Sequence, residues 1–334
     1  MSERVEPVSP GADVPRGERV RALATHPLAV AGVIIVALLV VGEWLSPGFA
    51  SADQILRQLT IAAILGTVAA GQNLVILGGR EGIDLSVGAL VSLGAVMAGN
   101  VMDGSNLMLI PGLVAAVAVT GVVGLVNGVG VTVFRIPPLV MTLGMLGVIQ
   151  GALVVITSGV PSGDAAPLLV ALVSEPLALG IPGVVMLWAI VAAGVIGLLR
   201  GTRFGYRVYA VGSNDLAAAL SGIPVRVIRA SLFGLSGAFA GLAGAFVLGY
   251  TGNSFIGVGE QYMLPSIIAV VIGGTSLAGG IGGYAGTVAG AIVLTLLQSI
   301  LTTLQLEAYG RQIVFGGVLL ALMLVYGRQR RLRG

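Results

Sequence analysis

Apolar segments close to the length of a membrane-spanning helix follow one another along almost the whole chain. A helix needs about 20 apolar residues to cross the hydrocarbon core of a bilayer. Charged residues make up only 9% of the sequence, whereas soluble domains carry about a quarter. We therefore expect an all-α polytopic membrane protein with about ten transmembrane helices. The expected spans are residues 28–45, 58–78, 84–100, 108–133, 139–157, 182–199, 229–250, 263–279, 284–305 and 311–326.

The first apolar segment, 28–45, has two interpretations. Small residues at 50–52 resemble a signal-peptidase site, but the apolar run is longer than that of a usual signal peptide and follows a long polar tail. We interpret the segment as the first transmembrane helix and keep cleavage as the alternative. The chain then divides into a polar, disordered tail at 1–27, a transmembrane domain at 28–327 and an arginine-rich tail at 328–334.

The arginines are distributed unevenly between the expected loops. When the spans alternate from a cytoplasmic N-terminus, every arginine except Arg57 and Arg311 falls in a cytoplasmic segment. Positive charges are enriched on the cytoplasmic side of membrane proteins, so we predict that both termini are cytoplasmic. The largest cytoplasmic loop is then 200–228, and the largest external loop, 158–181, carries acidic residues but no arginine.

Residue types that the sequence lacks exclude several classes of catalytic and metal-binding site. The chain has no Cys and a single His, His26, which excludes thiolate metal sites, cysteine nucleophiles, Ser–His–Asp triads and two-histidine metal sites. It also has no Lys, and a Walker A phosphate loop needs one. We therefore expect no catalytic residue and no metal site in this chain. The arginines that give the chain its basic net charge lie where the topology of a membrane protein requires them, so we expect no nucleic-acid partner.

Glycines interrupt the apolar pattern at two similar places. An apolar run ends in paired glycines at 78–79 and again at 273–274, and each run is followed by a segment of small residues. Interrupted helices at corresponding positions of an internal repeat are typical of a transporter binding path. We expect broken or re-entrant helices there, because such backbone is tolerated at membrane depth only inside protein or beside water. Glycines at four-residue spacing elsewhere predict close helix packing.

Four segments carry a family resemblance. They read G-G-R-E-G-I-D-L-S-V-G at 78–88, I-P-P-L-V-M-T-L-G at 136–144, F-G-Y-R-V-Y-A-V-G-S-N at 204–214 and V-I-G-G-T-S-L-A-G-G at 271–280. In this order they resemble signature segments of the ribose/xylose/arabinose-type permeases of bacterial ABC importers, and the resemblance runs from about residue 55 to 327. The chain departs from the family pattern at Arg80-Glu81, which leaves the local chain path at that turn open.

The resemblance implies a fold and a set of partners. The fold would be the type II arrangement of the vitamin-B12 importers. Two permease subunits, either two copies of this chain or this chain and a paralogue, would work with two ATP-binding subunits and an extracytoplasmic sugar-binding protein. ATP and Mg²⁺ would be bound by the partner, with no cofactor in this chain, and the missing Lys agrees with this. The protein would lie in the bacterial inner membrane.

The 200–228 loop contains an expected coupling helix. Residues 215–220 are rich in Ala and Leu, with Asn214 or Ser213 as a suitable N-cap and Gly222 as a suitable stop. The resemblance implies that this helix docks into the ATP-binding subunit, and a plain surface helix is the alternative. The residues expected to couple are Arg203, Phe204, Gly205, Asn214, Asp215, Ala217, Ala218, Gly222 and Ile223.

Transport of a neutral polyol needs hydrogen-bonding groups inside the membrane. Polar side chains within spans are costly unless paired, so they face the interior of the bundle. For each of them, a structural bond between helices is the alternative to lining the path, and Asp84 also suits a helix N-cap. The candidates for the translocation path are Gln72, Asn73, Asp84, Ser86, Asn127, Thr142, Thr275 and Ser276.

These observations favour the permease subunit of an ABC importer for a monosaccharide or similar small polyol. Within the same superfamily, the alternatives are importers of branched-chain amino acids, nucleosides or a furanose-like signalling molecule, but the segments at 82–86 and 273–280 favour the sugar branch. From another class, a self-sufficient secondary transporter would need chains of buried acids or histidines, and nearly all charges here lie at the ends of spans.

Overall fold

The computed structural model describes residues 27–80, 82–160, 163–178 and 180–331. The tail expected at 1–27 lies outside these residues except for Pro27, as do His26, Glu81 and residues 332–334. The long elements are α2 (Pro27–Leu45), α3 (Ala52–Leu77), α4 (Val87–Met102), α5 (Leu109–Thr132), α6 (Pro138–Thr157), α8 (Gly183–Gly201), α11 (Val225–Thr251), α12 (Met263–Ile272), α13 (Tyr284–Thr303) and α14 (Ala308–Arg331).

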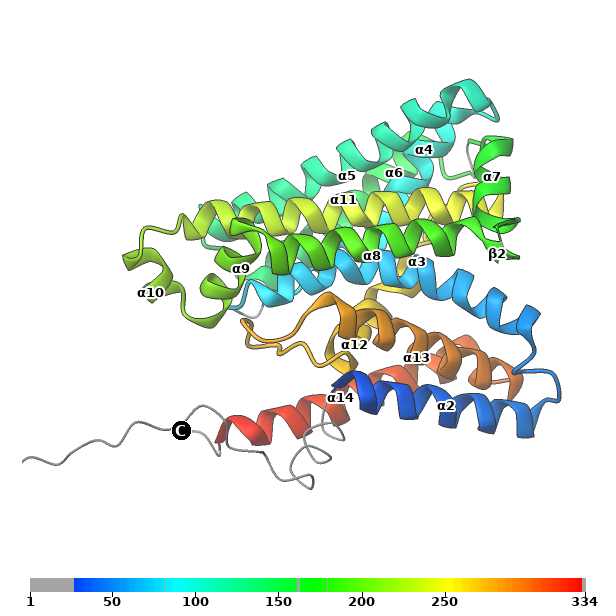
Figure 1. Cartoon of the computed structure of the whole chain (residues 1–334). Coiled ribbons are helices and arrows are strands. Elements are labelled where there is room, and N and C mark those ends of the chain that lie inside the picture. Colours follow the sequence, from blue (N-terminus) through cyan, green and yellow to red (C-terminus); the bar gives the residue numbers. More distant parts are fainter. Residues whose placement is uncertain (1–26, 81, 161–162, 179, 332–334) are drawn as a thin grey trace, which may run out of the picture.

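Shorter elements lie at the two ends of the bundle. At one end are α9 (Arg203–Ser213) and α10 (Asp215–Leu220), and at the opposite end are α7 (Pro167–Ser174) and a small hairpin of β1 (Pro176–Ala178) and β2 (Ile181–Pro182) (Figure 1). Single turns of 3₁₀-helix, η1 (Asn106–Met108) and η2 (Glu260–Tyr262), precede α5 and α12. The hairpin departs from the all-α expectation. It lies in the segment predicted as an external loop, except for Pro182, which was expected to begin the next span.

The structure confirms a helical polytopic membrane protein. Seven of the described helices are long and apolar enough to cross a membrane. The apolar helices α4, of 16 residues, and α12, of 10 residues, are shorter than this. A helix overlaps each expected span, but the number of crossings stays a prediction.

Small residues hold the centre of the bundle together. Helix α11 packs against α3, α4 and α5, and a side chain at Gly124 or Gly128 of α5 would collide with the backbone of α11 at Phe233 or Ala230. Gly94 of α4 faces the backbone of Gly241 in the same way. Because lipid provides little hydrophobic drive for association, close backbone contact is what brings such helices together. The close packing predicted from glycine spacing is therefore confirmed here.

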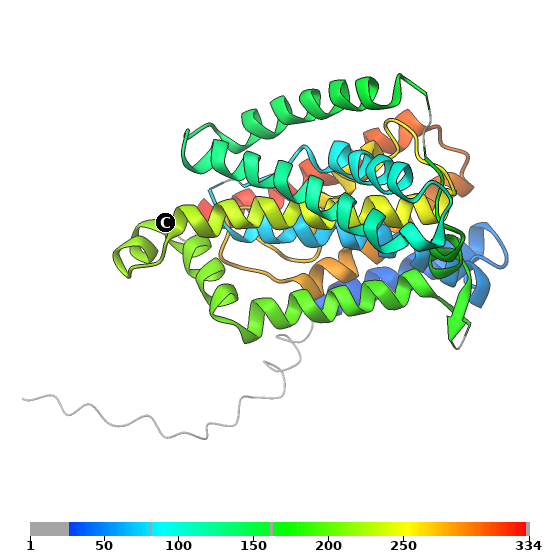
Figure 2. The ribbon, with the colours of Figure 1, turned by 90° about the horizontal axis from the view of Figure 1, so that it is seen from above.

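Both glycine interruptions are confirmed as breaks between helices. Helix α3 ends at Leu77 and α4 begins at Val87, while α12 ends at Ile272 and α13 begins at Tyr284. Both intervening segments lie at the end of the bundle that carries α9 and α10 (Figure 1). Helix α6, in contrast, stands apart along one edge of the bundle (Figure 2).

Candidate functional site

Helix α10 forms where the sequence predicts it. The Asn214 side chain accepts a hydrogen bond from the backbone N–H of Ala217 over 3.0 Å, so Asn214 is confirmed as the N-cap. After the helix ends at Leu220, Gly222 takes a left-handed backbone with φ of 78°, which glycine adopts without strain. The Ile223 N–H then donates to the Ala218 carbonyl over 3.0 Å and closes the turn.

The segment before α10, which was predicted as part of a loop, is a helix. Helix α9 begins at Arg203, and the Thr202 side chain caps it by accepting a 3.1 Å hydrogen bond from the N–H of Gly205. Gly205 packs directly against the backbone of Leu199, so it allows a sharp bend between α8 and α9. Phe204 is half-buried at the start of α9. The loop expected at 200–228 is therefore mostly helical.

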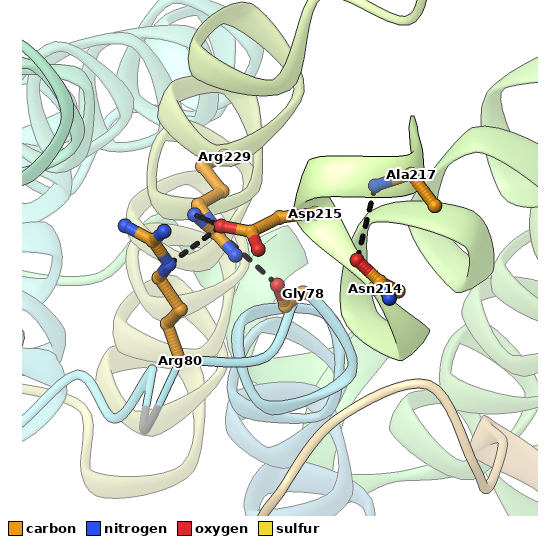
Figure 3. A network of polar contacts seen from close by, with 6 residues as sticks. All are labelled: Gly78, Arg80, Asn214, Asp215, Ala217 and Arg229. Carbon is orange, nitrogen blue, oxygen red and sulfur yellow. Dashed lines mark hydrogen bonds and ion pairs between the residues drawn. The ribbon is translucent and has the colours of Figure 1, made fainter. Parts of the chain in front are cut away.

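An ionic contact ties α10 to the break after α3. The Asp215 carboxylate, at the first residue of α10, pairs with Arg80 and lies 3.3 Å from a terminal guanidinium nitrogen of Arg229 on α11 (Figure 3). The Arg229 Nε also donates to the carbonyl of Gly78 over 3.3 Å. We call Arg80, Asp215 and Arg229 the ionic cluster. It joins the break after α3 to the consecutive helices α10 and α11, which come much later in the sequence.

Glycine backbones meet beside the ionic cluster. The Gly280 N–H donates to the carbonyl of Leu77 over 3.0 Å, and a Cβ added at Gly279 would collide with Gly79. Gly212, near the end of α9, lies against Leu77 and Gly280 so closely that it too admits no side chain. We call Gly79, Gly212 and Gly279 the glycine junction. Both helix breaks and the coupling segment thus meet in one place.

The outward face of α10 is apolar. Leu216 and Leu220 are 69% and 83% exposed, and their i,i+4 spacing places them on one side of the helix. Ala218 is buried and packs inward instead. Ala217 and Ala218 were among the residues expected to couple, whereas the two leucines were not, although their i,i+4 spacing is visible in the sequence.

A buried polar network surrounds Asp84. Its carboxylate accepts hydrogen bonds from the backbone N–H and the hydroxyl of Ser86 and from the Ser236 hydroxyl, and the Asn127 amide donates to the Ser86 hydroxyl over 2.9 Å. With its amide oriented to pair both groups, Gln72 bonds to the backbone N–H and C=O of Asp84. The network links α3, α5 and α11 to the turn before α4. The expectation that Asp84 is the N-cap is wrong, because α4 begins at Val87 and Ser86 holds the cap position.

A second network joins α3 to the second break. The Asn73 amide donates to the hydroxyls of Thr275, over 2.9 Å, and Thr287, over 3.0 Å. Thr142 donates to Pro138 O in its own helix, and the Ser276 hydroxyl accepts from the N–H of Ala278. All of the path candidates except half-buried Ser276 are thus buried, and each makes at least one hydrogen bond within this chain. The Oδ1 atoms of Asn73 and Asn127 have no hydrogen-bond partner among the described residues.

A cavity of about 590 Å³ opens next to the ionic cluster. The break after α3, the end of α5, the start of α6, α10 and the start of α11 supply its walls. None of the path candidates lines it. Among the residues that the structure describes, its walls are apolar apart from Thr132, Asp215 and four arginines.

Residues 54–325 match the family described as "Branched-chain amino acid transport system / permease component". The chain belongs to this family of permease components. It is 33% identical over 303 residues to the ribose import permease protein RbsC of Escherichia coli K12, covering 89% of this chain and 93% of that protein. Similarity to the Bacillus subtilis 168 RbsC is 35% over 292 residues, covering 86% of this chain and 89% of that one.

Similarity extends to a permease with a different named cargo. The autoinducer 2 import system permease protein LsrC of Escherichia coli K12/DH10B is 34% identical over 299 residues, covering 89% of this chain and 85% of that protein. No solved structure matches the chain. Family membership confirms the resemblance found in the sequence and the prediction that this chain is a permease rather than an enzyme.

Proposed function

We propose that this chain forms the membrane path of an ABC importer for a monosaccharide or similar small polyol, with ATP hydrolysis in a separate subunit. The observation that carries this proposal is similarity over nearly the whole chain to ribose import permeases. Similarity to an autoinducer 2 import permease favours a furanose-like signalling molecule as the second candidate. Both cargoes are small, neutral and rich in hydroxyls, which agrees with a chain whose described spans carry few charges.

The substrate is tested by reconstitution. The chain, with its ATP-binding and binding-protein partners, is placed in liposomes, and uptake of labelled ribose, xylose, arabinose, autoinducer 2, branched-chain amino acids and nucleosides is measured with ATP present on the side of the ATP-binding subunit. We expect ATP-dependent uptake of a sugar. Uptake by the chain alone, without ATP, would instead support the secondary-transporter alternative. Uptake of branched-chain amino acids or nucleosides alone would remove the sugar assignment.

The exposed face of α10 is proposed to dock with the ATP-binding subunit. Leu216 and Leu220 form an apolar ridge at the end of the bundle, as suits a short helix that enters a groove of a partner (Figure 1). The other expected coupling residues support this ridge. Asn214, Ala217, Gly222 and Ile223 shape the helix, and Asp215 anchors it to Arg80 and Arg229.

Leu220→Asp tests the docking face. A charge on the ridge would be desolvated on binding, so we expect the variant to insert in the membrane but to lose co-purification with the ATP-binding subunit. Leu177→Asp is the matched control, because Leu177 is also exposed but lies in the hairpin at the opposite end. Co-purification of the Leu220→Asp variant at the wild-type level would rule out this face as the docking site.

Movement of α10 is proposed to reach the membrane through the ionic cluster and the glycine junction. The cluster fixes α10 to the break after α3, and the junction places the end of α9 against both breaks. The two buried networks then connect these breaks to α3, α5 and α11. In this proposal, Gln72, Asn73, Asp84, Ser86, Asn127 and Thr275 set the positions of the helices that border the path.

We propose that a second permease subunit completes the path. The separate position of α6 supports this (Figure 2), as do the exposed side chains Val140, Val148 and Val155 along it. The orientation is proposed from the arginines. The described ends of the chain, at α2 and α14, lie toward the same end as α10 (Figure 1), and cytoplasmic termini would place the docking face where ATP is available.

A further inference from the structure

A tyrosine of α9 bonds to the second helix break. The Tyr209 hydroxyl donates a 2.9 Å hydrogen bond to the carbonyl oxygen of Gly282, which lies two residues before α13 begins. Among the residues that the structure describes, this hydroxyl is the only donor to that carbonyl. Tyr209 was not among the residues expected to couple. The middle of α9 is thus joined to the place where the broken helix starts again.

Hydrogen bonds within the second break close it into a loop. The Ser276 N–H donates to the carbonyl of Ile281 over 2.9 Å. The Gly283 N–H donates to the Thr275 hydroxyl over 3.3 Å, and a side chain at Gly282 would collide with Thr275. Because the loop is closed in this way, a displacement of the Gly282 carbonyl also displaces Thr275.

Both ends of this loop are tied to the interior of the bundle. The Asn73 amide of α3 donates to the Thr275 hydroxyl. The first residue of α13 is Tyr284, whose buried hydroxyl donates to the carbonyl of Gly66 over 2.7 Å and accepts from the indole N–H of Trp188 over 2.9 Å. A displacement that starts at α9 therefore reaches α3 and α8.

The bond between Tyr209 and Gly282 lies where water can replace it. Tyr209 is half-buried and Gly282 is exposed. If the hydroxyl is removed, water can hydrate the carbonyl, and a water-mediated bond is nearly as favourable as a direct one. We therefore expect the hydroxyl to contribute little to the stability of the fold. What water cannot replace is the direct connection between the two elements.

We propose that Tyr209 is a positioning residue that links α9 to the second break, so that movement of the segment docked to the ATP-binding subunit displaces the start of α13. This inference rests on the proposed function, in which that segment meets the ATP-binding subunit. Gly212 of the glycine junction also touches the second break, at Gly280, but through steric contact. Steric contact can push the loop away, whereas a hydrogen bond can also draw it back.

Removing only the hydroxyl tests this role. In the transporter reconstituted with its ATP-binding subunit and binding protein, Tyr209→Phe should leave ATP hydrolysis in place while sugar uptake per ATP falls about five-fold, as expected for the loss of one neutral hydrogen bond. Tyr206→Phe is the matched control and should keep wild-type uptake, because Tyr206 lies on the same helix, is 73% exposed and makes no side-chain hydrogen bond among the described residues. Unchanged uptake per ATP in Tyr209→Phe, or an equal fall in ATP hydrolysis, would overturn the proposal.

A second measurement does not depend on which substrate is carried. Because the chain has no Cys, Ile281→Cys, at a 64% exposed position beside Gly282, can be labelled with one environment-sensitive fluorophore before the subunits are assembled. We expect ATP to change its fluorescence, and Tyr209→Phe to reduce that change several-fold without lowering the melting temperature. An equal change in Tyr209→Phe, no change in either protein, or a much lower melting temperature would overturn the role of Tyr209. A change that depends on Tyr209 but comes without sugar uptake would contradict the sugar assignment and still support this role.

Discussion

Asp84 shows how a carboxylate is accommodated deep inside this chain. A buried carboxylate needs donors to replace the water it loses, and Ser86 and Ser236 supply them. The bonds run from the turn before α4 to α11, so the side chain fixes one helix break against the centre of the bundle. A proton relay would need a further titratable group, and none of the bonding partners described for the Asp84 carboxylate is titratable.

Ser236→Ala should lower the stability of the bundle. The substitution removes one donor and leaves a buried carboxylate oxygen short of a bond, which costs about 1–3 kcal/mol. The melting temperature of the detergent-solubilised chain measures the effect. Ser231→Ala on the same helix is the control, because among the described residues the Ser231 hydroxyl bonds only to the carbonyl of Ile228. If Ser231→Ala lowered the melting temperature as much as Ser236→Ala, the hydrogen bond to Asp84 would contribute no more to stability than a bond within the helix.

Local chemistry could be predicted from sequence, whereas long-range pairing could not. The N-cap at Asn214 and the stop at Gly222 depend on residues within one turn, so their identities were sufficient. The contact of Arg80 with Asp215 joins residues that only the tertiary fold brings together. The partner of Asn73 at Thr287 was missed for the same reason.

At the scale of elements, α10 is anchored on one side and free on the other. Its first residue is held by the ionic cluster, while Leu216 and Leu220 point outward. A short helix fixed only at one end would rotate about that end when a partner pushed on it. The additional contact between Gly212 and the two breaks gives the segment a second point of support through α9.

Asp215→Asn should uncouple ATP hydrolysis from uptake. The substitution removes the charge that pairs with Arg80 and Arg229 but keeps the side-chain volume, so the subunits should still assemble. We expect ATP hydrolysis by the assembled transporter to continue while sugar uptake per ATP falls several-fold. Asp215→Glu should retain most coupling, and Asp53→Asn, at the other end of the bundle, should retain all of it. Unchanged uptake per ATP in Asp215→Asn would remove the cluster from the coupling route.

Gly279→Ala should disrupt the glycine junction. The added Cβ would collide with the backbone of Gly79, and the left-handed φ of 90° disfavours alanine as well. We expect a large loss of uptake and a lower melting temperature. Gly197→Ala is the matched control, because nothing lies near a Cβ added there and the residue is inside a helix. Wild-type uptake by Gly279→Ala would mean that the backbones can separate without consequence.

At the scale of the whole molecule, the two ends of the bundle differ in positive charge. The α3–α4 break, the α5–α6 turn and the α9–α10 segment, which carry arginines, lie at the α10 end (Figure 1). Arg57 and Arg311 belong to the first half of α3 and of α14, the halves farther from that end. This is the division that the sequence predicts from counting arginines. The sequence did not predict the length of α12 or the helical character of 203–213, because packing against neighbours decides both.

Cysteine labelling tests the proposed orientation without interference, because the chain has no Cys. Ser221→Cys lies in the turn after α10, and Ser174→Cys lies at the end of α7. In intact cells, a membrane-impermeant maleimide should label Ser174→Cys alone, and Ser221→Cys should react only after lysis. The opposite pattern would invert the topology and place α10 away from any cytoplasmic ATPase.

The exposure of Arg80 predicts that its ion pair with Asp215 depends on the salt concentration of the cell. The Arg80 side chain is 70% exposed, whereas that of Arg229 is 11% exposed. An exposed ion pair weakens as the ionic strength rises, because the Debye length shortens from about 8 Å at physiological salt to about 3 Å at 1 M. Rising salt would therefore weaken the ion pair between Arg80 and Asp215 more than the ion pair between Arg229 and Asp215. In the proposed coupling route, a cell under osmotic stress would therefore lose transport efficiency before the protein unfolded.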